Sequence, residues 1–271
     1  MDHRPDGQVL TVIAVALTFA SGAMDVASFT RLGTVFTSVM TGNIVLMGLA
    51  VARGSLTLAS HTAVAIVGYI AGVAGGSRIA VGARAAAKAA GAGKDGAGKD
   101  AGGKNPGGQN DDTRVGEGRA AGWPAHITWA LLAELGLLGG FAIGWEVTGA
   151  RPGGWVQFFL LAVAAAGMGV QSSAVKNMGL TEVSTTYLTG TLTGLVSSLV
   201  SPGPRATDRW RRLGVLLGLA AGASLTGLLV ATAPDGVPAL PLAALITCVA
   251  LASWPGRAVV RRQRSRSDSQ G

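Results

Sequence analysis

The chain has 271 residues, of which 49% are hydrophobic and 13% are charged, and its mean hydropathy is +0.44. Soluble domains carry about 25% charged residues, so this composition excludes an ordinary soluble protein and indicates an integral membrane protein. The formal net charge is +8, but aromatic residues do not interleave with the basic ones, so we expect no nucleic-acid partner.

Eight apolar runs of roughly membrane-spanning length follow one another along the chain, since a spanning helix needs about 20 such residues. They are residues 9–29, 35–52, 58–81, 127–147, 156–175, 183–200, 213–233 and 237–254. The six tryptophans fall at or near the ends of these runs, where amphipathic rings prefer the membrane interface. We therefore expect an all-α polytopic bundle.

The first run contains Asp25 near its carboxyl end, and a short connection leads from it to a polar segment. This segment, residues 36–48, is polar in its first half and apolar in its second half, with Thr41-Gly42 near its centre. We call it the first Thr-Gly segment. A second Thr-Gly segment follows later in the chain, and these two segments are the shortest and most polar of the eight apolar runs.

The next run carries Gly68, Gly72 and Gly76 at four-residue spacing, which places them on one helix face. In lipid such small residues let helix backbones approach closely, so the sequence predicts a packing helix. Residues 84–123 are rich in Gly, Ala and Lys and cannot bury a core, so we expect a disordered basic linker.

After the linker, the run at 127–147 contains Glu134 and the run at 156–175 contains Gln171. The second Thr-Gly segment follows, with Thr189-Gly190 near its centre. A basic loop at residues 205–212 leads to the last two runs, and residues 257–271 form an Arg-rich tail.

The two halves of the chain share a weak internal repeat that keeps its register across three blocks. The matched positions are Asp25 with Gln171 at 146 apart, Thr41-Gly42 with Thr189-Gly190 at 148, and Gly68 and Gly72 with Gly218 and Gly222 at 150. We therefore expect two pseudo-symmetric units, which in a membrane protein points to transport before catalysis.

The predicted organisation follows from this repeat and from the linker. Residues 1–83 form the first membrane repeat together with 124–148, and residues 84–123 form the linker. The remaining membrane helices, with the second repeat, lie within residues 124–256, and the tail at 257–271 is cytoplasmic.

The charges between the runs bear on how many runs cross. If all eight cross, Lys and Arg divide almost evenly between the two sides. If both Thr-Gly segments dip in and return, six spans remain and only Arg31, Arg53 and Arg151 lie on one side. The positive-inside rule then places both termini, the linker and the basic loop in the cytoplasm of a bacterial inner membrane. A first Thr-Gly segment that crosses alone fits the charges equally well, with the amino terminus outside. We prefer six spans because the repeat favours treating both segments alike, and seven or eight stay open.

Several motifs resemble those of the YoaK-like family of bacterial membrane proteins. They are Gly22-Ala-Met-Asp25, Phe36 through Thr41-Gly42-Asn43 with Gly48 following, Glu134 in a Leu-rich helix, and Gly167-Met-Gly-Val-Gln171 before Thr185-Thr-Tyr-Leu-Thr-Gly190. The resemblance covers nearly the whole chain apart from residues 82–122 and the tail. It implies an integral membrane location and supplies no reaction. The chain departs from the family in its long linker and in Thr191, where the second motif often has Asn.

The Thr-Gly segments have the side chains of a solute path. Hydroxyls, an amide and exposed backbone carbonyls can replace water around a solute, and non-helical backbone at membrane depth is tolerated only against protein or a water-filled cavity. The candidates for substrate binding or pore lining are Thr37, Ser38, Thr41, Gly42, Asn43, Gln171, Thr185, Thr186, Thr189 and Gly190. The alternative is that these groups form hydrogen bonds between helices in a dry core.

Asp25 and Glu134 are the carboxylates that lie most plainly inside apolar runs. An ionisable group in a bilayer is costly, so each is a candidate for proton or cation coupling. The alternatives are that Asp25 pairs with Arg31 and that Glu134 lies near the membrane interface.

The sequence offers no catalytic or metal-binding constellation. His61 and His126 are lone histidines near run ends, and metal sites need several converging ligands, so we expect neither a metal nor a cofactor. Cys248, the only cysteine, is predicted to be a packing residue. We do not expect an enzyme.

The leading hypothesis is a transporter-like inner-membrane protein that binds or moves a small solute at the interface of the two repeats. The alternative is a non-transporting scaffold or regulatory protein with a packed Thr-Gly core. In either case the basic loops and tail are expected to contact anionic lipid.

Overall fold

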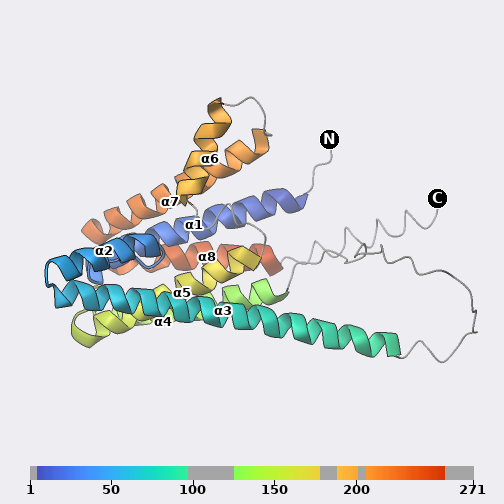
Figure 1. Cartoon of the computed structure of the whole chain (residues 1–271), viewed down its shortest axis with the longest axis horizontal. Coiled ribbons are helices and arrows are strands. Elements are labelled where there is room, and N and C mark those ends of the chain that lie inside the picture. The colour runs from blue at the N-terminus through green and yellow to red at the C-terminus, as the bar shows by residue number, and fades with distance from the viewer. Residues whose placement is uncertain (1–4, 97–124, 178–187, 201–205, 254–271) are drawn as a thin grey trace, which may run out of the picture.

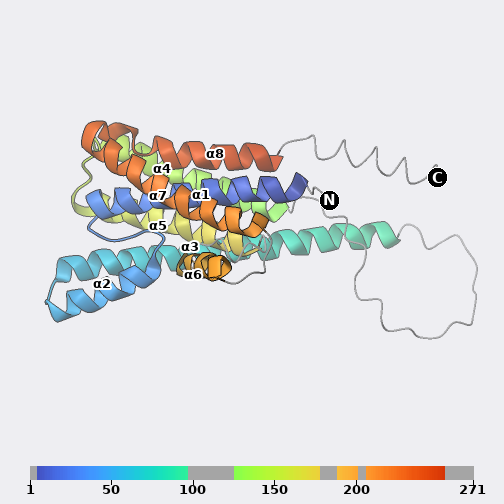
Figure 2. The same cartoon turned by 90° about the horizontal axis from the view of Figure 1, so that it is seen from above.

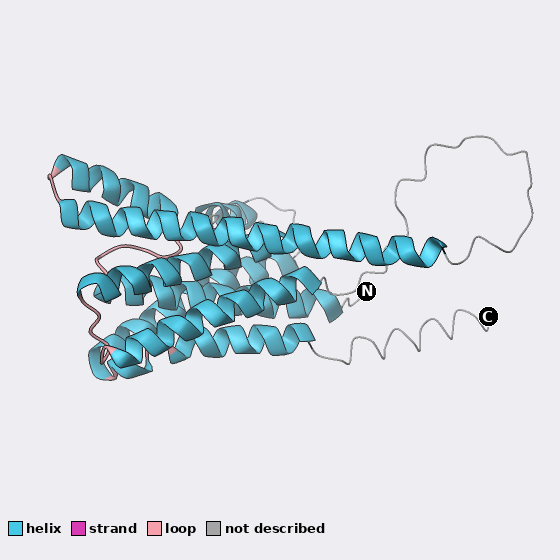
Figure 3. Cartoon of the chain, turned by 90° about the horizontal axis from the view of Figure 1, so that it is seen from below, coloured by secondary structure: helices cyan, strands magenta, loops and turns pink. Residues whose placement is uncertain are grey.

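The computed structural model describes residues 5–96, 125–177, 188–200 and 206–253, which are nearly all helical. The helices are α1 (Pro5–Arg31), α2 (Met40–Ala52), α3 (Leu56–Gly96), α4 (Ala125–Val147), α5 (Gly154–Asn177), α6 (Leu188–Val200), α7 (Ala206–Thr232) and α8 (Ala239–Ser253), with a short 3-10 helix at Pro234–Gly236. These residues contain no strand (Figure 3). The predicted all-α class is confirmed.

Six of the described helices are long and apolar enough to cross a membrane, namely α1, α3, α4, α5, α7 and α8 with its preceding 3-10 turn. Helix α2 has 13 residues. At 1.5 Å per residue it is about 20 Å long, which is less than the roughly 30 Å of a hydrocarbon core. The described part of α6 also has 13 residues. The helix lengths therefore agree with six spans and two shorter Thr-Gly segments.

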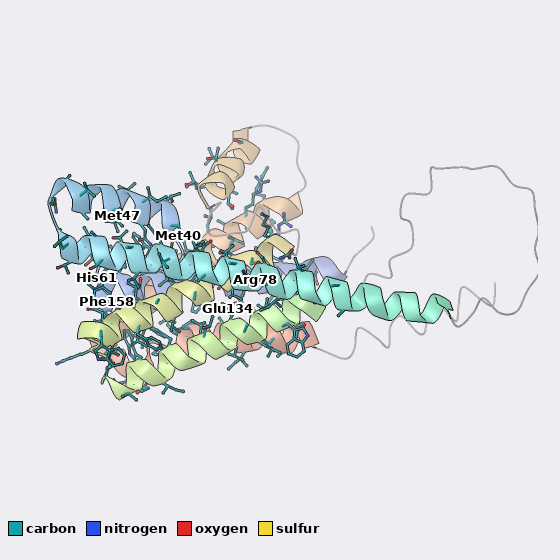
Figure 4. All side chains as sticks on the ribbon, turned by 60° about the horizontal axis from the view of Figure 1, so that its bottom comes forward. Met40, Met47, His61, Arg78, Glu134 and Phe158 are labelled. Atoms are coloured by element: carbon teal, nitrogen blue, oxygen red, sulfur yellow. The ribbon has the colours of Figure 1, made fainter. Side chains whose placement is uncertain are left out.

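The first Thr-Gly segment dips into the bundle and returns to the end from which it came. Helix α1 ends at Arg31, residues 32–39 fold back along the bundle, and α2 returns to the end where α3 begins (Figures 1 and 2). Met40, the first residue of α2, lies farther from that end than Met47 does (Figure 4). Helix α2 therefore begins at depth, beside α3.

The two ends of the bundle differ in charge. We call the end with the turns at residues 53–55, 148–153 and 233–238 the turn end, and the opposite one the linker end. Arg31, Arg53 and Arg151 lie at the turn end. Basic residues toward the linker end include Arg78, Lys176, Arg209, Arg211 and Arg212.

Two close helix crossings hold the bundle together, and glycines form both. A Cβ added at any of four glycines would meet backbone atoms of the partner helix. The pairs are Gly68 with Ala162 and Gly72 with Ala166 between α3 and α5, and Gly218 with Val15 and Gly222 with Phe19 between α7 and α1. Residue numbers rise together in both crossings, so each helix pair runs parallel. The glycines are the positions that the sequence comparison paired.

Glycines on the opposing helices complete each crossing. Gly22 of α1 lies against the α7 backbone and Gly169 of α5 lies against the α3 backbone. Gly22 and Gly169 differ by 147 in residue number. The other contact positions on these two helices, Val15 with Ala162 and Phe19 with Ala166, differ by the same number. The repeat in the sequence pairs Asp25 with Gln171, 146 residues apart, whereas the separation of 147 in the contacts pairs Asp25 with Ser172.

Helices α1 and α5 run in opposite directions. The Gln157 side chain donates a hydrogen bond to the Arg31 carbonyl oxygen (2.9 Å), and the Gln171 side chain donates one to the Leu17 carbonyl oxygen (2.9 Å). Residue numbers rise on one helix as they fall on the other. Helices α1 and α5 are therefore antiparallel.

Helix α3 is longer than the sequence predicted. The linker was expected from residue 84, whereas α3 continues to Gly96. The reason is local, because residues 83–90 consist of alanine, arginine and lysine, which have high helix propensity. The rest of the predicted linker and the predicted tail lie outside the described residues.

We expect Gly72→Val to destabilise the protein, because its Cβ would meet the Ala166 carbonyl oxygen. Overpacking of a close contact costs about 1–3 kcal/mol, so the midpoint of thermal unfolding in detergent should fall. Gly75→Val, on the same helix, is the matched control because a Cβ there has nothing within 4 Å. Equal midpoints for the two variants would contradict a tight crossing.

Candidate functional site

The Asp25 carboxylate is enclosed by the loop that leads into α2. Its Oδ1 accepts hydrogen bonds from the backbone N–H groups of Thr37 and Ser38, both at 2.8 Å, and from the Thr37 hydroxyl at 3.0 Å. Its Oδ2 accepts one from the Ser38 hydroxyl at 2.5 Å. The two amides directly precede α2, so the carboxylate also lies at the positive end of that helix dipole.

The backbone of this loop, residues 32–39, is satisfied by further side chains, and we call it the anchored loop. The Phe36 N–H donates to Asn43 Oδ1 (2.9 Å), and Asn43 Nδ2 donates to the Phe36 carbonyl oxygen (2.7 Å). The Ser28 hydroxyl donates to the Val35 carbonyl oxygen. Asn43 therefore replaces a backbone partner, and the extended segment keeps its polar groups paired inside the bundle.

His61 supports the anchored loop from α3. Gly33 has a φ of 108°, and a Cβ there would meet the imidazole ring of His61. The ring stacks on Phe158 of α5 with centroids 4.3 Å apart, and Nδ1 lies 2.7 Å from the Thr57 carbonyl oxygen (Figure 4). The sequence does not indicate this role for His61, because its partners Gly33 and Phe158 are distant in the chain.

The structure gives the predicted pore-lining residues of the Thr-Gly segments different places. Thr37, Ser38 and Asn43 are buried, and their polar groups bond within the protein, as described above. Thr41, Thr189 and Gly190 are exposed, and Gly42 is half-buried. Thr185 and Thr186 lie outside the described residues. Helix α2 packs on α3 and α6 on α7, and Figure 1 shows the two short helices apart.

Gln171 connects the two halves at the level of α1. Its Nε2 donates to the Leu17 carbonyl oxygen at 2.9 Å and to the Ser21 hydroxyl at 3.0 Å. Its Oε1 is buried and has no hydrogen-bond partner. Ser21 was not among the predicted site residues. The signal for it was the stripe Thr18, Ser21, Asp25 and Ser28, which places polar residues on one face of a buried helix.

Glu134 is fully buried, with 0% of its surface exposed, and neither carboxyl oxygen has a hydrogen-bond partner. It lies midway along the bundle (Figure 4). The interfacial position considered as an alternative is therefore not observed. Cys248 of α8 is close enough for the two groups to interact electrostatically.

The pairing of Asp25 with Arg31 is not observed either. The Arg31 guanidinium donates to the Val230 carbonyl oxygen at 3.2 Å, whereas Asp25 bonds only to the anchored loop in the contacts above. Among the residues that the structure describes, no three His, Cys, Asp or Glu side chains are grouped to hold a metal ion.

A family model described as "Protein of unknown function (DUF1275)" matches residues 13–253. The chain is also 28% identical over 183 residues to the UPF0700 transmembrane protein YoaK of Bacillus subtilis (strain 168). That match covers 68% of this chain and 64% of the relative, so it spans just under two thirds of the relative's length. No solved structure matches.

We expect Asp25→Asn to loosen the anchored loop. The substitution keeps the side-chain shape but replaces one acceptor oxygen by a donor, and each buried hydrogen bond left unmade costs roughly 1–3 kcal/mol. The amide hydrogens of residues 36–39 should then exchange roughly tenfold faster or more in hydrogen-exchange mass spectrometry. Glu146→Gln, at an exposed carboxylate on α4, is the control. Unchanged exchange in Asp25→Asn would show that the carboxylate does not hold the loop.

Proposed function

The chain belongs to the DUF1275 family and is a multi-pass membrane protein, and we propose from its geometry that it is a transporter of a small solute. The two halves act as inverted repeats, and the solute binds where α1, α4 and α5 meet. Three features support this proposal.

The first is the construction of the bundle. Each half has a glycine-lined helix, α3 or α7, that packs in parallel against the first helix of the other half. The first helices, α1 and α5, run in opposite directions and each precedes a short helix that carries a Thr-Gly pair. Interrupted segments at matching positions of two inverted halves are the best sequence pointer to a transporter site.

The second feature, which carries the proposal, is the set of unpaired polar atoms at the junction of the halves. Both oxygens of Glu134 and Oε1 of Gln171 are buried without a hydrogen-bond partner. Leaving such groups unpaired inside an apolar bundle costs several kcal/mol, by order of magnitude. In a scaffold these unpaired atoms would only destabilise the bundle, whereas in a transporter they can bind the solute.

The third feature is the segregation of charge. Positive residues are few at the turn end, which holds Arg31, Arg53 and Arg151, and numerous toward the linker end. The positive-inside rule therefore favours a bacterial inner membrane with the linker end in the cytoplasm. Basic residues at that end are then placed to contact anionic lipid headgroups.

A scaffold is the second candidate, and the anchored loop favours it. The hydroxyls of Thr37 and Ser38 and the amide of Asn43 bond to the protein and are not free to bind a solute. If the centre of the bundle excludes water as this loop does, the protein is a packed scaffold and does not transport a solute.

Hydration of the centre separates the two candidates. In a Cys248→Ser background, we expect a cysteine at Gln171 or Ser21 to react with a small, membrane-impermeant thiol reagent, because a solute path must admit water. A cysteine at Ala164, which is buried in the apolar core on the same helix α5, is the matched control and should not react. If neither central cysteine reacts from either side, the scaffold takes the place of the transporter.

Orientation can be measured on the same background. We expect single cysteines at Arg31 and Arg53, which flank the first Thr-Gly segment, to be labelled from outside the cell, and those at Arg78 and Lys176 only after the membrane is opened. Labelling of Arg31 and Arg53 on opposite sides would contradict six spans with a dipping first Thr-Gly segment.

A further inference from the structure

Three buried oxygen atoms at the centre of the bundle, Glu134 Oε1, Glu134 Oε2 and Gln171 Oε1, have no hydrogen-bond partner. We propose that they form a binding site for a small monovalent cation, either a proton or a sodium ion. The coupling role of this site rests on the proposed transport function, whereas the binding itself does not.

The register of α4 against α5 brings the two residues together. A Cβ added at Gly167 would lie 3.4 Å from the Leu138 side chain and 3.8 Å from that of Leu137. A Cβ added at Gly144 would meet Leu160, so residue numbers fall on α4 as they rise on α5 and the helices are antiparallel. One helical turn further along each helix, Glu134 therefore lies level with Gln171.

The contacts one helical turn beyond Glu134, on the side away from Leu138, agree with that register. Ala130 of α4 packs in one cluster with Val170 and Ala174 of α5. The Glu134 carboxyl thus lies between two layers of apolar contacts, and no part of the residue is exposed. Only a small occupant can reach it there.

The unpaired atoms at this level are all acceptors. Gln171 Nε2 already donates to the Leu17 carbonyl oxygen and to Ser21. The Cys248 thiol already donates to the Ile13 carbonyl oxygen at 3.8 Å. What the site lacks is a donor or a positive charge, so an anion or a second acceptor would not be bound here.

A proton or a sodium ion supplies what is missing. When a proton adds to the Glu134 carboxylate, the resulting O–H can donate to Gln171 Oε1, and the carboxyl becomes neutral. A sodium ion instead takes its coordination from the carboxylate and amide oxygens. Either occupant removes the cost of an uncompensated charge in an apolar interior.

The titratable groups around Glu134 do not supply that charge. Cys248 faces it from α8. Helix α3 also packs on α4, and between residues 56 and 83 it carries His61, Tyr69 and the exposed Arg78, whereas α5 carries Lys176 near its end. Asp25 cannot replace Glu134 as the site, because donors of the anchored loop already occupy both of its oxygens.

Infrared difference spectroscopy of the full chain in lipid tests the proposal. Spectra are taken across a pH series, in sodium chloride and in choline chloride at equal ionic strength. We expect the C=O band of a protonated carboxyl in wild type and in Glu146→Gln, and its complete loss in Glu134→Gln. In Gln171→Leu the band should move to higher frequency, because the hydrogen bond to Oε1 is lost.

The two salts distinguish the occupants. A band that persists in sodium chloride identifies a proton alone. A band that sodium chloride removes, with release of a proton to the medium, identifies competition with sodium, and the apparent sodium affinity should then fall about tenfold for each unit of falling pH. Both results support the site.

Two results would overturn the proposal. One is the absence, at every pH, of a carboxyl band that depends on Glu134, together with spectra that sodium does not change. The other is equal loss of the band in Glu134→Gln and Glu146→Gln. If Glu134→Gln does not fold, Glu134→Asp keeps the carboxyl and should shift the band.

The cysteine labelling described above separates the site from transport. A cation bound at Glu134 in a bundle whose central cysteines stay unlabelled would support the site and refute transport. Reactive central cysteines without the band would refute only the site.

Discussion

A backbone that leaves helical geometry inside an apolar bundle must find all its hydrogen-bond partners within the protein. The anchored loop meets this constraint chiefly through two side chains, the carboxylate of Asp25 and the amide of Asn43, with the Ser28 hydroxyl as a third partner. Without them the extended residues would carry unpaired polar groups, and α2 could not begin at depth. The shape of the first half therefore depends on one charged and one neutral side chain.

The loop also determines how the second half is held. Gly33 leaves room for His61 of α3, and His61 stacks on Phe158 of α5. The loop, α3 and α5 thus meet at the turn end, and α3 can continue along α5 through the close contact at Gly72. Helix α5 also reaches α1 through Gln171, so α5 joins the anchored end of the bundle to the polar centre.

The sequence was sufficient for features that repeat at short range. Apolar run length gave eight candidate spans, the charges between them favoured the six that the described residues contain, and the four-residue glycine spacing predicted the face on which α3 packs. It was insufficient where partners are distant or where packing decides. Nothing local distinguishes a carboxylate that will accept four hydrogen bonds, as Asp25 does, from one that will accept none, as Glu134 does. The linker boundary failed because an alanine-rich segment extends a helix without any apolar signal.

Asp25 and Glu134 look alike in the sequence, yet the fold gives them opposite capacities. The charge of Asp25 is compensated by fixed donors, so a ligand would have to displace the loop before it gained a contact. The oxygens of Glu134 have no such competitor. A ligand that pairs with them removes the free-energy cost of burying them unpaired. A buried polar group that the protein satisfies stabilises the fold, whereas one that it leaves unsatisfied favours binding. By this argument we expect ligand exchange at Glu134 and not at Asp25, which holds the anchored loop.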